Sequence, residues 1–232
     1  NDQQSKLYEA VRATMQASIQ KIVAEKGFKR SQIQILDALL KLRQVCCHPS
    51  LLKLDSVKSG QAHSAKLEQL MDMVVPMVEE GRKILIFSQF TSMLELIAQQ
   101  LDHAEIGYVK LTGQTKKRDE VITAFQSGQV PVFLISLKAG GVGLNLTTAD
   151  TVIHYDPWWN PAAEDQASDR AWRIGQDKPV FVYKLITNKS IEEKILALQQ
   201  NKAELAHSIL STDHEGEAKL TENDVMNLFE KF

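Results

Sequence analysis

Short apolar segments alternate with amphipathic segments over residues 83–186, and this alternation constrains the fold more than any other feature. The apolar segments have the length of strands, and the segments between them show helical periodicity. Apolar strands separated by helices predict a parallel sheet covered on both faces, since each strand must be buried on both sides. Strands are expected at residues 83–87, 108–112, 130–136, 151–156 and 180–186. The predicted fold class is α/β, a doubly wound parallel sheet with helices on both faces.

Helical segments are also expected before and after the α/β region in the sequence. The first 62 residues have two helical periodicities separated at Gly27. At the other end, Ser190 and Glu193 have the spacing of a capping box for a helix to about Leu210, and Thr221 can cap a short last helix. The expected domains are a helical N-terminal segment, a central α/β lobe and a C-terminal bracing helix with a short terminal helix, at 1–62, 63–189 and 190–232.

Composition excludes several classes of protein. A hydrophobic fraction of 44% and a charged fraction of 24% are ordinary for a globular chain. No apolar run approaches the ~20 residues of a membrane span, and the polar start at Asn1 does not resemble a signal peptide, so no membrane partner and an intracellular location are expected. Cys46 and Cys47 are adjacent, which argues against a disulfide framework or a zinc site. A net charge of −2 means that any contact with nucleic acid must be local.

Polar and glycine-rich segments follow the first three expected strands. Parallel sheets bind ligands beyond the carboxyl ends of their strands, so these segments are candidate binding loops. They contain Ser88 and Gln89, then Thr112 and Gly113, then the run SLKAGGVGLNL at 136–146. The glycines of that run allow the backbone to approach a ligand closely, so that consecutive N–H groups can bind a phosphate oxygen. These glycines are Gly140, Gly141 and Gly143.

A fourth candidate segment follows the strand at 151–156. Asn160 is a suitable N-cap and Pro161 suits the first helical position, so a helix is expected from there to about Arg173, ended by Gly175.

Three polar side chains of this expected helix would project from one face, because they are four and three residues apart: Gln166, Arg170 and Arg173. Two guanidiniums and an amide on one face suit the terminal phosphates of a nucleotide. The same spacing also fits a solvated face with ion pairs inside the helix. The acidic partners for that alternative are Glu164, Asp165 and Asp169.

The run DQASDRAWRIGQ at 165–176 resembles motif VI of superfamily-two helicases and translocases. With the preceding residues HYDPWWNPAAEDQA, it is similar to the SWI/SNF family of DNA-translocating ATPases, and the similarity extends over about residues 42–210. Ser88 and Gln89 look like motif IV, and 136–146 looks like motif V. The resemblance implies a RecA-like lobe, the second of two that form an ATPase.

The resemblance also implies roles for individual residues. The catalytic residues would be the arginine fingers Arg170 and Arg173, and ATP with Mg²⁺ would be the cofactor. The residues implied to bind ATP are Gln166, Gly141, Gly143, Arg170 and Arg173. Those implied to contact double-stranded DNA are Ser88, Gln89, Thr112, Gly113, Lys138, Ala139, Gly140 and Trp158. One of Trp158 and Trp159 is expected in the core, which is the usual place for tryptophan. The sequence LTGQTKKR departs from the acidic residue that many relatives have before the glycine, which leaves the DNA contacts there open.

No phosphate-binding loop of the Gly-(four residues)-Gly-Lys-Ser/Thr type occurs in the chain. In the family the first lobe provides this loop and the magnesium ligands, so no metal ligand is assigned here and the first lobe is an expected partner. The chain is therefore interpreted as a fragment that does not hydrolyse ATP alone. The DNA-bound protein that such a motor displaces is a further expected partner.

Two alternative functions were compared with this one. A dinucleotide site is disfavoured because Leu146 stands where the fingerprint needs its third glycine. A noncatalytic RecA-like module that docks DNA or a protein stays open, although the intact arginine motif argues against it. The lack of an evident histone-reading insert favours a bacterial nucleoid location, and a nuclear one is expected if the protein is eukaryotic.

Overall fold

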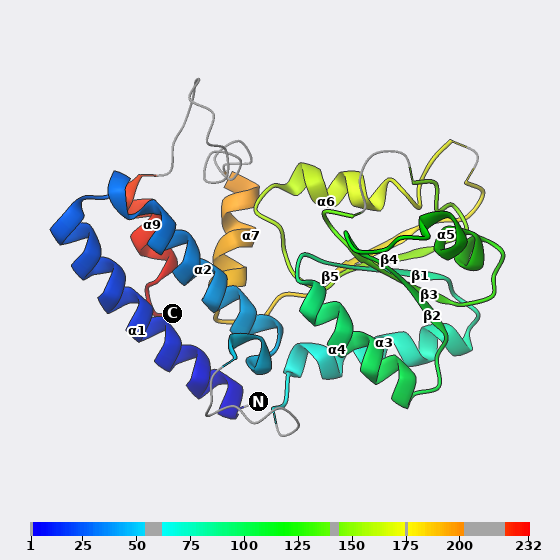
Figure 1. Ribbon diagram of the computed structural model, residues 1–232, viewed down its shortest axis with the longest axis horizontal. Helices are drawn as coiled ribbons and strands as arrows, with labels where there is room; N and C mark the ends of the chain where they lie inside the picture. The colour runs from blue at the N-terminus through cyan, green and yellow to red at the C-terminus, as the bar shows by residue number, and fades with distance from the viewer. Residues whose placement is uncertain (1, 54–61, 140–143, 175, 202–220) are drawn as a thin grey trace. The chain divides into compact units, whose positions relative to one another are not determined.

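The computed structural model describes residues 2–53, 62–139, 144–174, 176–201 and 221–232 (Figure 1). The chain divides into two compact units. One consists of Asn1–Ala65 and Thr187–Phe232, and the other of Lys66–Ile186. Each unit is described by itself below.

The unit Lys66–Ile186 is built on a parallel sheet of five strands in the order β2-β3-β1-β4-β5. The strands are β1 (Ile84–Ser88), β2 (Tyr108–Leu111), β3 (Val132–Ser136), β4 (Thr151–His154) and β5 (Phe181–Lys184). All five expected strands are confirmed; β1 is shifted by one residue, and the other four are shorter than expected. Because β1 lies between β3 and β4, the carboxyl ends of these three strands meet at the point where the strand order reverses. Ligands bind at that point in sheets of this kind.

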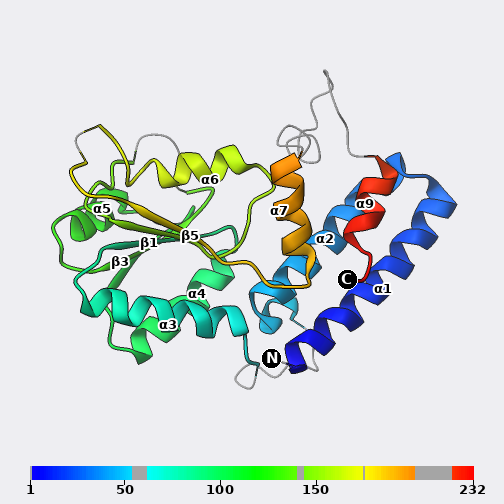
Figure 2. The same ribbon diagram turned by 180° about the vertical axis from the view of Figure 1, so that it is seen from behind.

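Helices cover both faces of the sheet, which confirms the expected doubly wound α/β fold. Figures 1 and 2 show α3 and α4 on one face and α5 and α6 on the other. Their bounds are α3 (Ala65–Glu79), α4 (Thr91–His103), α5 (Arg118–Gln126) and α6 (Pro161–Ser168). Phe125 of α5 and Ala167 of α6 are buried in one cluster with Phe87 and Phe133 of the sheet. This packing fixes α6, and the chain that follows it, against the sheet.

Strand β5 departs from the expected burial. It pairs with β4 alone and forms an edge of the sheet, whereas β1, β3 and β4 are buried along their whole length. Phe181 and Val182 are 48% and 46% exposed. The guanidinium of Arg82 lies over the Phe181 ring, 4.8 Å from its centroid.

The other unit is helical. Its elements are α1 (Asp2–Lys26), η1 (Lys29–Ser31), α2 (Gln32–Cys47), η2 (Pro49–Leu52), α7 (Ile191–Asn201) and α9 (Glu222–Leu228). The expected capping of the last helix is confirmed, because the Thr221 side chain accepts from the Asp224 N–H and the Asp224 carboxylate accepts from the Thr221 N–H. Within the described residues, no helix is both long enough and apolar enough to cross a membrane.

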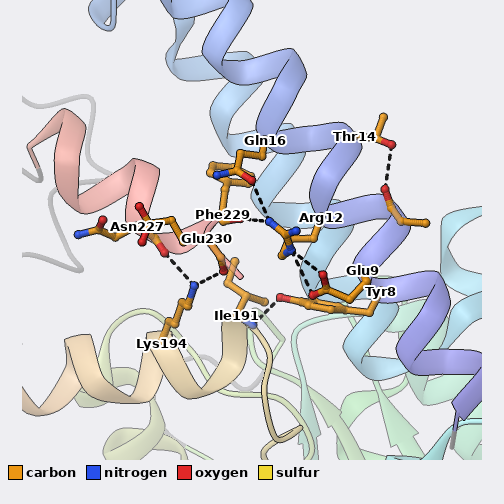
Figure 3. Close-up of polar contacts among 11 residues, drawn as sticks. Tyr8, Glu9, Arg12, Thr14, Gln16, Ile191, Lys194, Asn227, Phe229 and Glu230 are labelled. Carbon is orange, nitrogen blue, oxygen red and sulfur yellow. Dashed lines mark hydrogen bonds and ion pairs between the residues drawn. The ribbon is translucent and has the colours of Figure 1, made fainter. Parts of the chain in front are cut away.

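Segments distant in sequence meet around the end of α9 (Figure 3). Arg12 of α1 donates from Nη1 to the Phe229 carbonyl at 2.7 Å, and Lys194 of α7 donates to the Asn227 carbonyl at 2.9 Å and to that of Glu230. The Tyr8 hydroxyl accepts from the N–H of Ile191 at 2.7 Å. Two cations thus bind the carbonyls at the C-terminus of α9, where the helix dipole is negative.

Candidate functional site

The loops after β1 and β4 are joined by hydrogen bonds at the carboxyl edge of the sheet. Ser88 is buried, and its hydroxyl donates to one carboxylate oxygen of the buried Asp156 at 2.5 Å. The other carboxylate oxygen accepts from the N–H of Gln89 at 3.3 Å, and the Ser88 hydroxyl accepts from the N–H of Phe90 at 3.1 Å. The Ser88 side chain is therefore engaged inside the protein. Ser88 can act on a ligand only indirectly. It holds the Asp156 carboxylate, which in turn positions the half-buried Gln89.

The two adjacent tryptophans differ in burial. Trp159 is buried at 4% exposure, which confirms the expectation that one of them packs in the core, and Trp158 is half-buried. The Trp158 N–H donates to the carboxylate of Glu164 at 2.7 Å, and the same carboxylate pairs with Lys184 at 2.8 Å. The buried carboxylate of Glu164 thus links this loop, α6 and β5.

The turn after β3 contains the first described residues of the glycine-rich run. Lys138 is exposed and Ala139 is buried, and the Ala139 carbonyl accepts from Nη2 of Arg118 at 2.8 Å. Arg118 therefore connects the start of α5 to this turn. Gly140, Gly141 and Gly143 lie outside the described residues.

The turn after β2 is closed by its own threonines. The Thr112 N–H donates to the hydroxyl of Thr115 at 2.9 Å, and the Thr112 hydroxyl accepts from the N–H of Gln114 at 3.3 Å. Gly113 at its tip is exposed, and a Cβ added there would meet nothing within 4 Å. This turn follows the edge strand β2, next to β3 in the sheet.

The expected helix with both arginines is wrong in its extent. Asn160 caps α6 as expected by accepting from the N–H of Ala162 at 3.0 Å, but the helix ends at Ser168 rather than at about Arg173. Of the three side chains expected on one helical face, Gln166 alone is on α6. The chain then makes a turn in which the N–H of Ala171 donates to the Ser168 carbonyl at 3.1 Å.

The backbone that follows α6 is hydrogen-bonded to another loop. The carbonyl of Arg170 accepts from the N–H of Leu146 at 2.9 Å instead of from a residue of its own helix. Nη2 of Arg173 donates to the carbonyl of Leu144 at 3.0 Å. The arginine segment is therefore hydrogen-bonded to the end of the glycine-rich run, so that the two candidate sites form one connected structure.

Gln176 strengthens this connection, and the sequence analysis did not single it out. Its side-chain Nε2 lies within hydrogen-bond distance of three carbonyls, those of Thr147 at 2.6 Å, Ala149 at 3.3 Å and Ala171 at 3.0 Å. Its place in the motif-like run was a signal, but the distant carbonyls that it binds could not be identified without the fold.

The two arginines create a cationic surface beside exposed apolar groups. Arg170 is half-buried and Arg173 is exposed. Burial lowers the pKa of Arg170, and the positive charge of Arg173 lowers it further, while Asp169 opposes this. Two guanidiniums close enough to repel each other favour an anion between them. Trp172, at 62% exposed, and the fully exposed Ile174 alternate with the arginines.

The alternative interpretation, in which the arginines form ion pairs inside their helix, is weakened. Glu164, one of the acidic residues expected to pair with them, is buried and pairs with Lys184. In the described part of the chain, no group of three or more His, Cys, Asp or Glu side chains could hold a metal ion.

Comparison with known proteins identifies the family. Residues 65–175 match the helicase conserved C-terminal domain. An uncharacterized ATP-dependent helicase of Mycoplasma genitalium is 39% identical over 204 residues, which cover 87% of this chain and 19% of that protein. The chain spans about a fifth of the length of the curated relatives it matches.

Solved structures agree with this match. The SWI2/SNF2 ATPase C-terminal domain of Sulfolobus solfataricus is 35% identical with a TM-score of 0.70, over 92% of this chain and 86% of that one. The SWI2/SNF2 ATPase core of the same organism in complex with double-stranded DNA is 37% identical with a TM-score of 0.72, over 90% of this chain and 43% of that one. The chain therefore belongs to the SWI2/SNF2 family of ATP-dependent helicases, in which it corresponds to the C-terminal RecA-like domain of the ATPase.

Proposed function

We propose that this chain is the second motor lobe of an ATP-dependent translocase on double-stranded DNA. The observation on which the proposal rests is the hydrogen-bonded connection between the glycine-rich run and the arginine segment. Leu146 binds the backbone of Arg170, and Arg173 binds the carbonyl of Leu144. A displacement of one segment must therefore move the other. Such coupling is what a motor needs between the site that holds DNA and the site that hydrolyses ATP.

In this proposal Arg170 and Arg173 are the arginine fingers. They stabilise the charge that spreads over the γ-phosphate during transfer, as guanidiniums do in other phosphoryl-transfer enzymes. The positive charge of Arg173 lowers the pKa of Arg170, so an anion bound near both guanidiniums would relieve their repulsion. Gln166, exposed on α6, helps to position the nucleotide together with the backbone at Gly141 and Gly143.

ATP enters with Mg²⁺, whose ligands we place on the first lobe. The cationic pair fits the phosphates of this cofactor, and the metal neutralises their charge when it is bound. This chain then supplies charge and orientation, whereas the phosphate-binding loop and the acidic residues belong to its partner lobe. We accordingly propose that the chain alone does not turn over ATP.

The proposed DNA surface lies on the loops at the same edge of the sheet. In this proposal the surface consists of Gln89, Lys138, the turn of Thr112 and Gly113, and Trp158. It also takes in Ala139 and Gly140, of which Gly140 lies outside the described residues. Few charges are involved, and the N–H groups of Gln89, Thr112 and Ala139 are bound within the protein. The proposed contact with the DNA backbone therefore relies on side chains such as those of Gln89 and Lys138. The related archaeal core was solved with double-stranded DNA, which supports this ligand class. A DNA-bound protein would be displaced as the motor moves.

The test is the hydrolysis of ATP by the two-lobe protein with Arg170→Ala or Arg173→Ala. Each variant is expected to bind duplex DNA normally and to lose at least about a thousandfold of DNA-stimulated turnover, since arginine fingers contribute 10³–10⁵ in kcat. Arg30→Ala, which removes an exposed guanidinium from η1 in the other unit, is the matched control and should keep full activity.

Turnover near the wild-type rate in both arginine variants would contradict the arginine roles. No duplex-stimulated hydrolysis by the wild-type two-lobe protein would favour the other function considered, a binding module without ATP turnover.

A further inference from the structure

His154 is a buried histidine at the carboxyl end of β4, and its ring binds the last residue of α6. It is 1% exposed and stacks on the ring of Phe87 at a centroid distance of 5.5 Å. Its Nε2 lies 2.9 Å from the hydroxyl oxygen of Ser168. The sheet and the end of the helix are therefore joined through one side-chain contact.

The other ring nitrogen determines the direction of this bond. Nδ1 of His154 is buried and has no hydrogen-bond partner in the described part of the chain. A buried N–H without an acceptor costs more than a buried lone pair without a donor. The tautomer that leaves no buried N–H without an acceptor has its proton on Nε2, and in it Nε2–H donates to the Ser168 hydroxyl.

Charged groups from three elements surround the ring. Burial is the largest effect and lowers the pKa of His154, Glu164 and Asp165 of α6 raise it, Lys184 of β5 lowers it, and Asp156 after β4 raises it. The net shift is downward, which favours the neutral ring near pH 7. Protonation would place a second N–H at Nδ1, where no acceptor faces it among the described residues.

Ser168 links this contact to the arginines. Its carbonyl accepts from the N–H groups of Ala171 at 3.1 Å and Trp172 at 3.4 Å, which form the turn that contains Arg170. The Arg170 carbonyl in turn binds Leu146. The hydroxyl of Ser168 is thus held by the sheet, and its carbonyl holds the turn.

We propose that His154 is a positioning residue whose Nε2–H fixes Ser168, and with it the turn from which Arg170 and Arg173 project. The inference rests on the proposed function, because positioning matters for activity if the arginines act on ATP. His154 itself touches neither nucleotide nor DNA, since it is buried in the sheet.

The first test measures turnover of the two-lobe protein. His154→Leu removes the donor, Ser168→Ala removes the acceptor, and His154→Gln can place an amide N–H near the position of Nε2. We expect kcat to fall about fivefold in the first two variants, from the loss of one hydrogen bond, with KM for ATP and affinity for DNA unchanged. The double variant should lose no more than either single one, because both changes remove the same bond.

His154→Gln should restore most of kcat, and Ser18→Ala on the exposed face of α1 is the control. Additive losses, or full activity of Ser168→Ala, would overturn the proposal.

The second test does not depend on catalysis. In nuclear magnetic resonance spectra of the 232-residue chain, the ¹⁵N shifts of His154 should report a neutral ring protonated on Nε2 at pH 7. Ser168→Ala should move the amide signals of residues 169–173, whereas Ser18→Ala should leave them in place. A proton on Nδ1, or changes confined to the substituted residue and His154, would reject the inference even if the proposed function holds. If the wild-type two-lobe protein proves inactive, the proposed function fails, and this second test still decides whether His154 positions the turn.

Discussion

At the scale of single residues, the Gln176 side chain binds backbone carbonyls that a charged side chain could not bind as well. The side-chain NH2 of Gln176 has two hydrogens and lies within hydrogen-bond distance of the carbonyls of Thr147, Ala149 and Ala171. Such a group suits these acceptors because it carries no charge to desolvate. A lysine or arginine would bring an ion into a half-buried position, and a carboxylate would repel all three carbonyls. The residue type thus follows from the carbonyls that converge on it.

We predict that Gln176→Ala lowers the free energy of unfolding by about 1–3 kcal/mol, because carbonyls that are partly shielded from water lose their donor. Gln176→Glu should cost at least as much, since it replaces the donor with a negative charge. Urea denaturation measures both changes. Gln129→Ala, at an exposed position, should change the unfolding free energy by less than about 0.5 kcal/mol. An equal, small effect at both positions would show that Gln176 does not stabilise the connection.

A second prediction at this scale concerns the loss of stability at acidic pH. Burial lowers the pKa of both His48 and His154 below the ordinary value of 6.5, and the Nδ1 of His48 accepts from the N–H of Ser50. Below pH 6.5 the unfolded chain therefore binds more protons at these sites than the folded chain does. This part of the stability is fully present above pH 6.5 and is lost as pH falls toward the folded pKa values, at most about 1.4 kcal/mol per pH unit for each histidine.

Urea denaturation between pH 7.5 and 5.5 measures this loss. His154→Gln should reduce the dependence of unfolding free energy on pH in that range, because the amide does not titrate. His103→Gln, on the exposed end of α4, is the matched control and should retain the wild-type dependence. The attribution to buried histidines would be wrong if His154→Gln and His103→Gln gave the same curve.

At the scale of secondary-structure elements, α9 depends on its neighbours. It has 7 residues, too few for a stable isolated helix, and its C-terminal carbonyls are bound by Arg12 and Lys194 (Figure 3). We predict that Arg12→Met, which keeps the aliphatic stem, destabilises α9 locally by about 1–3 kcal/mol. Hydrogen exchange of the amides at 225–229 should then become faster by about one order of magnitude, while the strands of the sheet keep their rates.

Lys21→Met, at an exposed position on the same helix, should leave the exchange of α9 unchanged. Uniform acceleration throughout the chain in Arg12→Met would show a global effect and would contradict a local role for the two cations.

The elements also show what the sequence can reveal and what it cannot. All five strands were predicted because each is a local apolar run between polar segments, and the caps at Asn160 and Thr221 were predicted because a cap binds residues two or three positions away. The end of α6 at Ser168 was not predicted, and neither was the bond between the Arg170 carbonyl beyond it and the distant Leu146, because local sequence does not show such a partner. Likewise the burial of Ser88 follows from its bond to Asp156, which belongs to another strand end.

At the scale of the whole molecule, the net charge differs in sign from the charge of the candidate site. The net charge is −2, so the chain as a whole does not attract DNA, and the cationic groups of the candidate site must act at short range. In the proposed function such a weak overall attraction is an advantage, because a motor must release DNA repeatedly. Tight, purely electrostatic binding would slow each step.

The proposed division of the ATPase site between two lobes leads to the last prediction, which compares the chain alone with the two-lobe protein. In the proposed function the chain supplies arginines for the transition state, and its sequence has no phosphate-binding loop. We therefore expect no ATP hydrolysis above background, with or without duplex DNA. The two-lobe protein should hydrolyse ATP, and duplex DNA should stimulate it strongly, since both sites then act through the connection between Leu146 and Arg170. Release of phosphate measures both. An active isolated chain would contradict a split site, and a two-lobe protein equally active without DNA would mean that this connection does not couple DNA binding to hydrolysis.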